Sequence, residues 1–266
     1  MTAPQPPLPR TDPTQTTLIT GASSGLGAEL ARQLAARGHD LALCARRTEL
    51  LTELANELSA MHPGIRVAVR AMDVTDEQQV VEGFQVLQTE LGRIDRVVVN
   101  AGVAGGAALG TGGHEANRQT VMTNFVGALA SADAAMRIFR AQQSGHLVFV
   151  ASMAGLRGLP GSLAAYSATK AALVRLAEGL RMELYGSAIK VTVLYPGYVA
   201  TELNPGARPG PMMSTVQAAG RAMVGAMEHE RPSAFIPRWP WAVLAPVMRY
   251  APLPLLRRMV GPRGAT

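Results

Sequence analysis

The chain has 266 residues, of which 48% are hydrophobic and 17% charged, so it is long enough to bury a core and too apolar to be disordered throughout. Its formal net charge is +6, but its arginines are scattered, and no stretch forms the dense basic run with interleaved aromatics of a nucleic-acid-binding surface. The single cysteine, Cys44, excludes an intrachain disulfide framework and a thiolate-rich metal site. The five histidines are dispersed without ligand spacing, so we expect no metal site.

The two ends of the chain carry no targeting or membrane-spanning pattern. Residues 1–15 are rich in proline and threonine and lack the apolar segment of a signal peptide, so we interpret them as a flexible leader. Near the other end, the longest uncharged stretch, 239–248, is too short and too interrupted by proline to cross a bilayer. We therefore expect a soluble, cytoplasmic protein.

Short apolar runs alternate along the chain with longer amphipathic patterns. The runs predict strands at 16–20, 40–45, 65–72, 94–100, 146–151, 190–195 and 233–236. The amphipathic patterns predict helices at 26–36, 49–60, 76–91, 115–141, 164–184 and 215–228. Because the strands are almost continuously hydrophobic, both their faces must be covered. The pattern predicts an α/β fold: a single Rossmann-type, doubly wound domain with a parallel seven-stranded sheet and helices on both faces.

This organisation divides the chain into three parts. We assign residues 16–232 to the Rossmann-type domain, which includes a substrate lid at 201–217. Residues 233–266 form the last strand and an apolar, proline-rich C-terminal extension. Candidate helix boundaries inside the domain are Asp76 as an N-cap, and Gly38 and Gly186 as residues that follow helix ends.

A glycine-rich segment connects the first strand to the first helix. Its glycines permit a tight turn and let a pyrophosphate approach the helix N-terminus, where amide donors and the helix dipole favour an anion. Glycine turns also end many ordinary strands, but after the first strand of an α/β chain this one predicts dinucleotide binding. The residues concerned are Gly21, Ser23, Ser24, Gly25, Leu26 and Gly27.

The residues after the second strand indicate which dinucleotide binds. NAD-binding sites usually have a carboxylate here, which accepts hydrogen bonds from the ribose. This chain instead has Arg46 and Arg47, whose guanidinium groups match a 2′-phosphate. Solvated arginines at a strand end are the alternative. We expect the cofactor to be NADP(H).

Four residues could carry acid–base chemistry. Tyr166 and Lys170 are four residues apart in a predicted helix, so they share one face, and a nearby ammonium favours the phenolate and lowers the tyrosine pKa. Ser152 follows the strand 146–151, at the sheet edge where ligands of α/β proteins bind. Asn124 lies inside the predicted helix 115–141, where an ordinary surface asparagine is the alternative.

Together these motifs resemble those of the short-chain dehydrogenase/reductase family, in its NADP-preferring form. The resemblance extends from residue 16 to 203, with Ala151 and Val99 standing where the family often has serine and asparagine. Sugar-nucleotide epimerases also share the Tyr-x-x-x-Lys spacing, but their glycine loop and chain length usually differ. The motifs that carry the resemblance are 20–27, Asp73, Asn100-Ala101-Gly102, Asn124, Ser152, Tyr166, Lys170 and Pro196-Gly197.

The resemblance implies a role for each matched residue. Tyr166 would be the general acid/base, and Ser152 would orient the substrate oxygen. Lys170 would bind the nicotinamide ribose and lower the pKa of Tyr166, while Asn124 would hold a water in the proton relay. The other implied cofactor contacts are Asp73, Val74, Asn100, Ala101, Gly102, Pro196, Gly197, Val199 and Thr201.

The expected function is an NADP(H)-dependent oxidoreductase that moves a hydride between the nicotinamide and a carbonyl or hydroxyl carbon. The alternative is a catalytically silent NADP(H)-binding regulatory or scaffold protein. Such a protein would need the glycine loop and Arg46 but not a phenol, so the complete set of Asn124, Ser152, Tyr166 and Lys170 favours the enzyme. The residues do not name the substrate, the direction or the stereochemistry.

The segments after the last motif bear on substrate and partners. The lid, 201–217, is rich in proline, glycine and methionine, and its apolar residues favour a hydrophobic small-molecule substrate over simple loop packing. We expect the C-terminal extension, with Trp239 and Trp241, to pack within the protein or its oligomer, peripheral membrane contact being the less favoured alternative. The resemblance implies a homodimer or homotetramer joined through helices 115–141 and 164–184.

Overall fold

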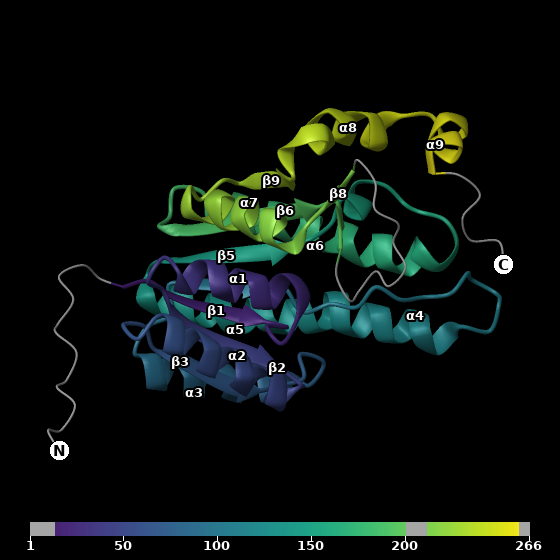
Figure 1. Ribbon diagram of the computed structural model, residues 1–266. Helices are drawn as coiled ribbons and strands as arrows, with labels where there is room; N and C mark the ends of the chain where they lie inside the picture. The colour runs from purple at the N-terminus through teal and green to yellow at the C-terminus, as the bar shows by residue number, and fades with distance from the viewer. Residues whose placement is uncertain (1–13, 201–211, 261–266) are drawn as a thin grey trace, which may run out of the picture.

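The computed structural model describes residues 14–200 and 212–260, and these form an α/β sandwich around one parallel sheet (Figure 1). The seven strands are β1 (Thr16–Thr20), β2 (Asp40–Ala45), β3 (Val67–Ala71), β4 (Arg96–Val99), β5 (Gly145–Val150), β6 (Ile189–Pro196) and β9 (Ser233–Ile236). They pair in the order β3-β2-β1-β4-β5-β6-β9, and every pair is parallel. The predicted Rossmann-type sheet is confirmed.

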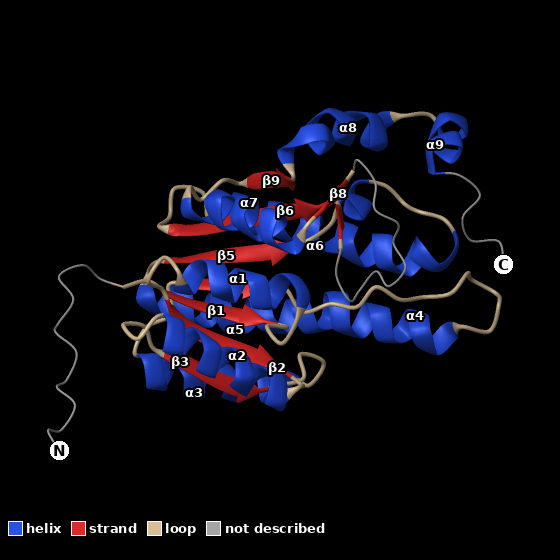
Figure 2. Ribbon diagram, viewed as in Figure 1, coloured by secondary structure: helices blue, strands red, loops and turns tan. Residues whose placement is uncertain are grey.

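Helices cover both faces of the sheet (Figure 2). One layer contains α1 (Gly25–Ala35), α2 (Thr48–Met61) and α7 (Val216–Glu228), and the other contains α3 (Glu77–Leu91), α5 (Gly127–Gln142) and α6 (Ala164–Glu183). Successive side chains of a strand enter opposite layers. In β1, for example, Leu18 belongs to the core cluster with α3, α5 and α6, whereas Ile19 belongs to the cluster with α1, α2 and α7.

Local signals set several of the helix ends. The Asp76 carboxylate accepts a hydrogen bond of 3.1 Å from the backbone N–H of Gln79, so the predicted N-cap of α3 is confirmed. Gly38 and Gly186, which follow α1 and α6, both have a φ of 81°, a conformation that favours glycine. These boundaries therefore follow from residue type at single positions.

The predicted continuous helix 115–141 is wrong in one respect. The segment consists of α4 (His114–Val121), a π-helical turn at Met122–Val126, and α5. Such wide turns insert one extra residue into a helix and occur often at functional sites. The turn here contains Asn124, and its consequence for that residue is described below.

The C-terminal extension contains two helices that the sequence patterns did not predict. They are α8 (Arg238–Tyr250) and α9 (Leu253–Val260), which follow β9 along one side of the molecule (Figure 1). Pro240 and Pro246 interrupt the α8 pattern, although proline is well tolerated in the first turn of a helix. Within the described ranges, no helix is long and apolar enough to cross a membrane.

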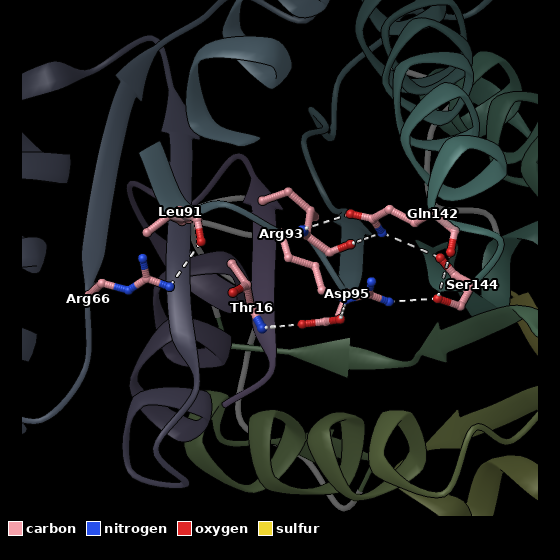
Figure 3. Close-up of polar contacts among 8 residues, drawn as sticks. Thr16, Arg66, Leu91, Arg93, Asp95, Gln142 and Ser144 are labelled. Carbon is pink, nitrogen blue, oxygen red and sulfur yellow. Dashed lines mark hydrogen bonds and ion pairs between the residues drawn. The ribbon is translucent and has the colours of Figure 1, made fainter. Parts of the chain in front are cut away.

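The amino ends of the strands are joined by polar contacts (Figure 3). The Asp95 carboxylate accepts hydrogen bonds from the Thr16 backbone N–H at 2.8 Å and from Arg93 Nε at 2.5 Å. Arg93 Nη2 also donates to the Ser144 hydroxyl at 2.6 Å, and Gln142 Nε2 donates to the Ile94 carbonyl at 2.8 Å. These contacts connect the strand ends at the amino edge of the sheet. The ligand cavity lies at the opposite, carboxyl edge.

Candidate active site

A cavity of about 1100 Å³ lies at the carboxyl edge of the sheet. The residues that follow β1 to β6 line it, as Rossmann-type sheets require of a ligand site. Every predicted site residue lines this cavity except two. Asn124 is completely buried beside it, and Thr201 lies outside the described residues, as do most of the residues predicted to form the lid.

The glycine loop fits a dinucleotide pyrophosphate. Gly21 and Gly25 have φ values of 67° and 56°, which only glycine adopts readily. A Cβ atom on Gly27 would lie 2.2 Å from the Gly21 carbonyl oxygen and 2.7 Å from Asn100 Nδ2, so no larger residue fits there. The Asn100 side chain donates to the carbonyls of Thr20 (3.0 Å) and Gly21 (3.1 Å), which ties the loop to the end of β4.

The two arginines after β2 stand at one rim of the cavity. Arg47 Nη2 donates to the hydroxyls of Ser23 at 3.2 Å and Ser24 at 2.5 Å, so its guanidinium lies over the start of α1. Arg46 Nη1 is 3.9 Å from the Asp73 carboxylate, on the other side of the same rim. Both cations therefore flank the region between the phosphate loop and the residues after β3.

Ser152, Tyr166 and Lys170 come together between the end of β5 and the start of α6. The Ser152 hydroxyl accepts a hydrogen bond of 3.1 Å from the Ala154 N–H and is also hydrogen-bonded to the Tyr166 hydroxyl. Lys170 Nζ donates to the Val150 carbonyl at 2.9 Å and lies 5.8 Å from the centre of the Tyr166 ring. The two hydroxyls and the amine thus lie within one small part of the cavity.

The charge states of Tyr166 and Lys170 depend on their burial. Burial raises the pKa of Tyr166, and the hydrogen bond from Ser152 opposes that rise only in part. Burial also lowers the pKa of Lys170, to about 8. In the protein without cofactor, desolvation of the phenolate is therefore the dominant effect, and the lowering of the tyrosine pKa by Lys170 stays a prediction for the site with nicotinamide bound.

Asn124 is buried and connects two segments of the chain by hydrogen bonds. Its Oδ1 accepts from the Val103 N–H at 2.7 Å, and its Nδ2 donates to the Val103 carbonyl at 2.9 Å and to Thr169 Oγ1 at 3.4 Å. The π-helical turn directs this side chain inward, so the alternative of an ordinary surface asparagine is wrong. Asn124 holds the chain after Gly102 against α6, one residue before Lys170.

The sequence patterns missed the apolar end of the cavity. Trp241 is buried there against Gly197, and its indole Nε1 has no hydrogen-bond partner among the described residues. The spacing of Trp241, Leu244 and Met248 on α8 could have indicated this wall, but the prolines of the extension hid the helix. Met212, from the predicted lid, also lines the cavity, and the missed apolar lining residues are Leu159, Leu163, Trp241, Leu244, Met248 and Leu256.

Replacement of Gly197 by alanine should displace α8. The added Cβ would lie 2.1 Å from Trp241 Nε1 and 2.2 Å from Cε2, so the rigid indole has to move, and we expect a loss of about 1–3 kcal/mol in the free energy of unfolding. Thermal unfolding and tryptophan emission would measure both effects. Gly225→Ala in α7 is the matched control, because its Cβ meets no atom within 4 Å and should stabilise the helix by up to about 1 kcal/mol. Equal behaviour of the two variants would contradict the close contact.

Comparison with known proteins agrees with this geometry. An uncharacterized oxidoreductase of Mycobacterium tuberculosis (strain H37Rv) is 48% identical over 244 residues, which cover 92% of this chain and 96% of that protein. The alcohol dehydrogenase of the archaeon Thermococcus sibiricus, solved with 5-hydroxy-NADP, superposes with a TM-score of 0.76 at 24% identity, over 84% of this chain and 96% of that chain. A short-chain dehydrogenase/reductase of Burkholderia phymatum, solved with NAD, gives the same TM-score and identity over 88% and 92%.

These two structures show the shared fold, and their ligands show that it accommodates either dinucleotide. The family model described as short chain dehydrogenase matches residues 15–211, which include the glycine loop, Ser152, Tyr166 and Lys170. The chain therefore belongs to the short-chain dehydrogenase family of oxidoreductases, which use a nicotinamide dinucleotide to act on alcohol and carbonyl groups.

Proposed function

We propose that the protein is an NADP(H)-dependent oxidoreductase that interconverts a carbonyl group and an alcohol on a hydrophobic small molecule. The observation that carries this proposal is the hydrogen-bonded pair of Ser152 and Tyr166, with the buried Lys170 beside it, in the same cavity as the glycine loop. A phenol, a hydroxyl and an amine placed together can bind an oxygen atom and move a proton to it.

The roles of these residues follow from their positions. Ser152 is fixed by the Ala154 N–H, and its hydroxyl orients the substrate oxygen toward Tyr166. Tyr166 holds its proton firmly, because burial raises its pKa, and donates it to that oxygen during carbonyl reduction. A nicotinamide bound in this cavity would supply or accept the hydride at the adjacent carbon. In oxidation, Tyr166 takes the proton back, with Lys170 as the neighbouring cation that stabilises its phenolate.

The choice of NADP(H) over NAD(H) rests on Arg46 and Arg47. No carboxylate follows β2, and the two guanidinium groups stand on the rim between the serines of the glycine loop and Asp73. A 2′-phosphate placed there would receive charge-assisted hydrogen bonds, which are worth about 1.5–3 kcal/mol each.

The double variant Arg46→Ser/Arg47→Ser should lose its preference for NADPH. We expect the Kd for NADPH to rise by about 10-fold to 100-fold, since one or two charged hydrogen bonds disappear, while the Kd for NADH changes by less than about threefold. Fluorescence titration of both nucleotides would measure this, and NADH is the internal control for a damaged loop. A wild-type protein that prefers NADH, or a variant that loses both nucleotides equally, would rule out the proposed 2′-phosphate contacts.

The substrate class is tested separately from the cofactor. Leu163, Met212, Leu244 and Met248 line the same cavity as Tyr166, so apolar carbonyl compounds should be reduced with higher kcat/KM than short polar ones. A panel of ketones and aldehydes of increasing apolar size, followed by NADPH oxidation, would show the trend. Turnover of none of them, despite tight NADPH binding, would favour the silent scaffold protein instead.

A further inference from the structure

The positive charge of the chain is concentrated at its C-terminal end. Residues 1–230 contain 19 basic and 19 acidic residues and are neutral overall. Residues 231–266 contain no acidic residue, and their six arginines account for the whole net charge of +6. The excess charge therefore belongs to the segment that forms β9, α8 and α9, not to the catalytic domain as a whole.

The same segment exposes large apolar side chains. On α8, the side chains of Trp239, Val243 and Tyr250 are 74%, 57% and 75% exposed, and Val247 lies between the last two on the same face. On the opposite face of the helix, Trp241 and Ala245 are buried. Leu253 and Leu255 of α9 are exposed as well. Both faces of α8 are thus apolar, although only one of them packs on the protein.

Exposed arginines flank these apolar side chains. Arg238, Arg249, Arg257 and Arg258 are all exposed, and none of them has an ion-pair partner among the residues that the structure describes. Several arginines on other helices are instead neutralised nearby, as in the pair of Arg137 with Asp133. The C-terminal face combines unneutralised cations with interfacial aromatics, the composition of a surface that rests on anionic lipid headgroups.

The position of the two helices suits such a contact. They follow one another along the outside of the molecule, beyond the edge strand β9 (Figure 1). Arg157 of the catalytic domain donates to the carbonyls of Arg249 (3.1 Å) and Ala251 (3.4 Å), which fixes the end of α8. The exposed face is therefore held rigidly, and its apolar side chains need no reorganisation before they enter an interface.

Two occupants could cover an apolar face of this kind, a second copy of the chain or a membrane. In a symmetric dimer the same patch meets itself, so arginines would face arginines without a single carboxylate in the segment to neutralise them. An anionic bilayer would both cover the apolar side chains and neutralise the arginines. We propose that α8 and α9 dock the protein on an anionic membrane surface, with Trp239 and Tyr250 at the headgroup level and the arginines against lipid phosphates.

Sedimentation of the full-length protein with lipid vesicles tests this. Vesicles of phosphatidylcholine with about one third phosphatidylglycerol should bind the protein, and pure phosphatidylcholine vesicles should bind it at least tenfold less. Arg257→Gln/Arg258→Gln should lower the partition coefficient about 25-fold, because each arginine near an anionic surface contributes about fivefold. Trp239→Ser should lower it by about tenfold through lost apolar burial.

The control variants distinguish binding through this surface from nonspecific binding to vesicles. Arg118→Gln/Arg137→Gln removes two exposed arginines from other helices, and Tyr185→Ser removes another exposed aromatic, 92% exposed after α6. Both controls should bind vesicles as the wild type does. Equal loss in the controls, or no binding to anionic vesicles at low salt, would overturn the proposal. So would light scattering that shows a dimer abolished by Trp239→Ser while vesicle binding stays unchanged.

Discussion

Replacement of Tyr166 by phenylalanine is expected to lower kcat for carbonyl reduction by a factor of about 10² to 10⁴. The change removes only the phenolic oxygen that is hydrogen-bonded to Ser152, so substrate oxygen would still reach the site but would have no positioned proton donor. The Kd for NADPH should change by less than about threefold, because the glycine loop and the arginine rim lie elsewhere in the cavity. Steady-state NADPH oxidation and fluorescence titration would measure the two quantities.

Tyr195→Phe is the matched control for this variant. Tyr195 is also a buried tyrosine whose pKa is raised by burial, but it packs against Phe235 in β9 and does not line the cavity. It should keep wild-type kcat. If Tyr166→Phe also kept wild-type turnover, Tyr166 would not be the general acid, and the hydride transfer proposed here would need another proton source.

Much of the fold could be predicted because its signals are local. β1 combines threonines with Leu18 and Ile19, and β2 is mostly apolar, so β-branched and apolar residue types mark these two buried strands. A parallel sheet then follows from the alternation of strands with helices, and the position of the glycine loop follows from the first strand. Asp76 and Gly38 act on the backbone within a few residues of themselves, which is why single positions sufficed to place helix ends.

The sequence indicated which residues would lie together in the cavity, but not how the cavity shifts their pKa values. Residue types and spacing brought together Ser152, Tyr166 and Lys170, because each follows a strand or starts a helix at one sheet edge. The direction of the Tyr166 pKa depends on how deeply the phenol is buried, a property of the whole cavity that spacing does not contain. Likewise, Asn124 bonds to Val103, 21 residues away, through a π-helical turn that no local pattern marks.

The C-terminal wall was missed for a related reason. The two prolines of α8 interrupt the pattern that predicts an amphipathic helix, so the segment was not predicted to be helical. The charge of the C-terminal segment is nevertheless distinctive, since residues 231–266 contain arginines and no acidic residue. The inner face of α8 lines the cavity, and its outer face is the one that we propose to contact a membrane.

Lys170→Met is expected to abolish most turnover and yet to stabilise the fold. Lys170 is buried, and burial lowers its pKa from 10.5 to about 8, so the folded protein binds this proton less readily than the unfolded chain does. The buried charge thus costs up to about 3 kcal/mol of stability below pH 8. Methionine has a similar shape without the charge, and loss of the hydrogen bond to the Val150 carbonyl offsets about 1 kcal/mol. A net gain of about 1–2 kcal/mol at pH 7 should accompany a kcat reduced about 10²-fold or more.

The stability should also depend on pH, and this dependence distinguishes the buried charge from a simple packing effect. Between pH 8 and 10.5 the unfolded chain holds the Lys170 proton and the folded chain releases it, so wild-type stability rises with pH, by about 1 kcal/mol from pH 8 to 9. Cys44 acts in the opposite sense from about pH 8 upward, because its thiol loses its proton in the unfolded chain while burial raises its pKa in the folded chain to about 12. The measured rise in wild type is therefore smaller than the contribution of Lys170 alone. Urea unfolding at pH 7, 8 and 9 should therefore show the rise in wild type and in the exposed-site control Lys190→Met, and its absence in Lys170→Met. A rise that persists in Lys170→Met would mean that another group, not the buried lysine, releases the proton on folding.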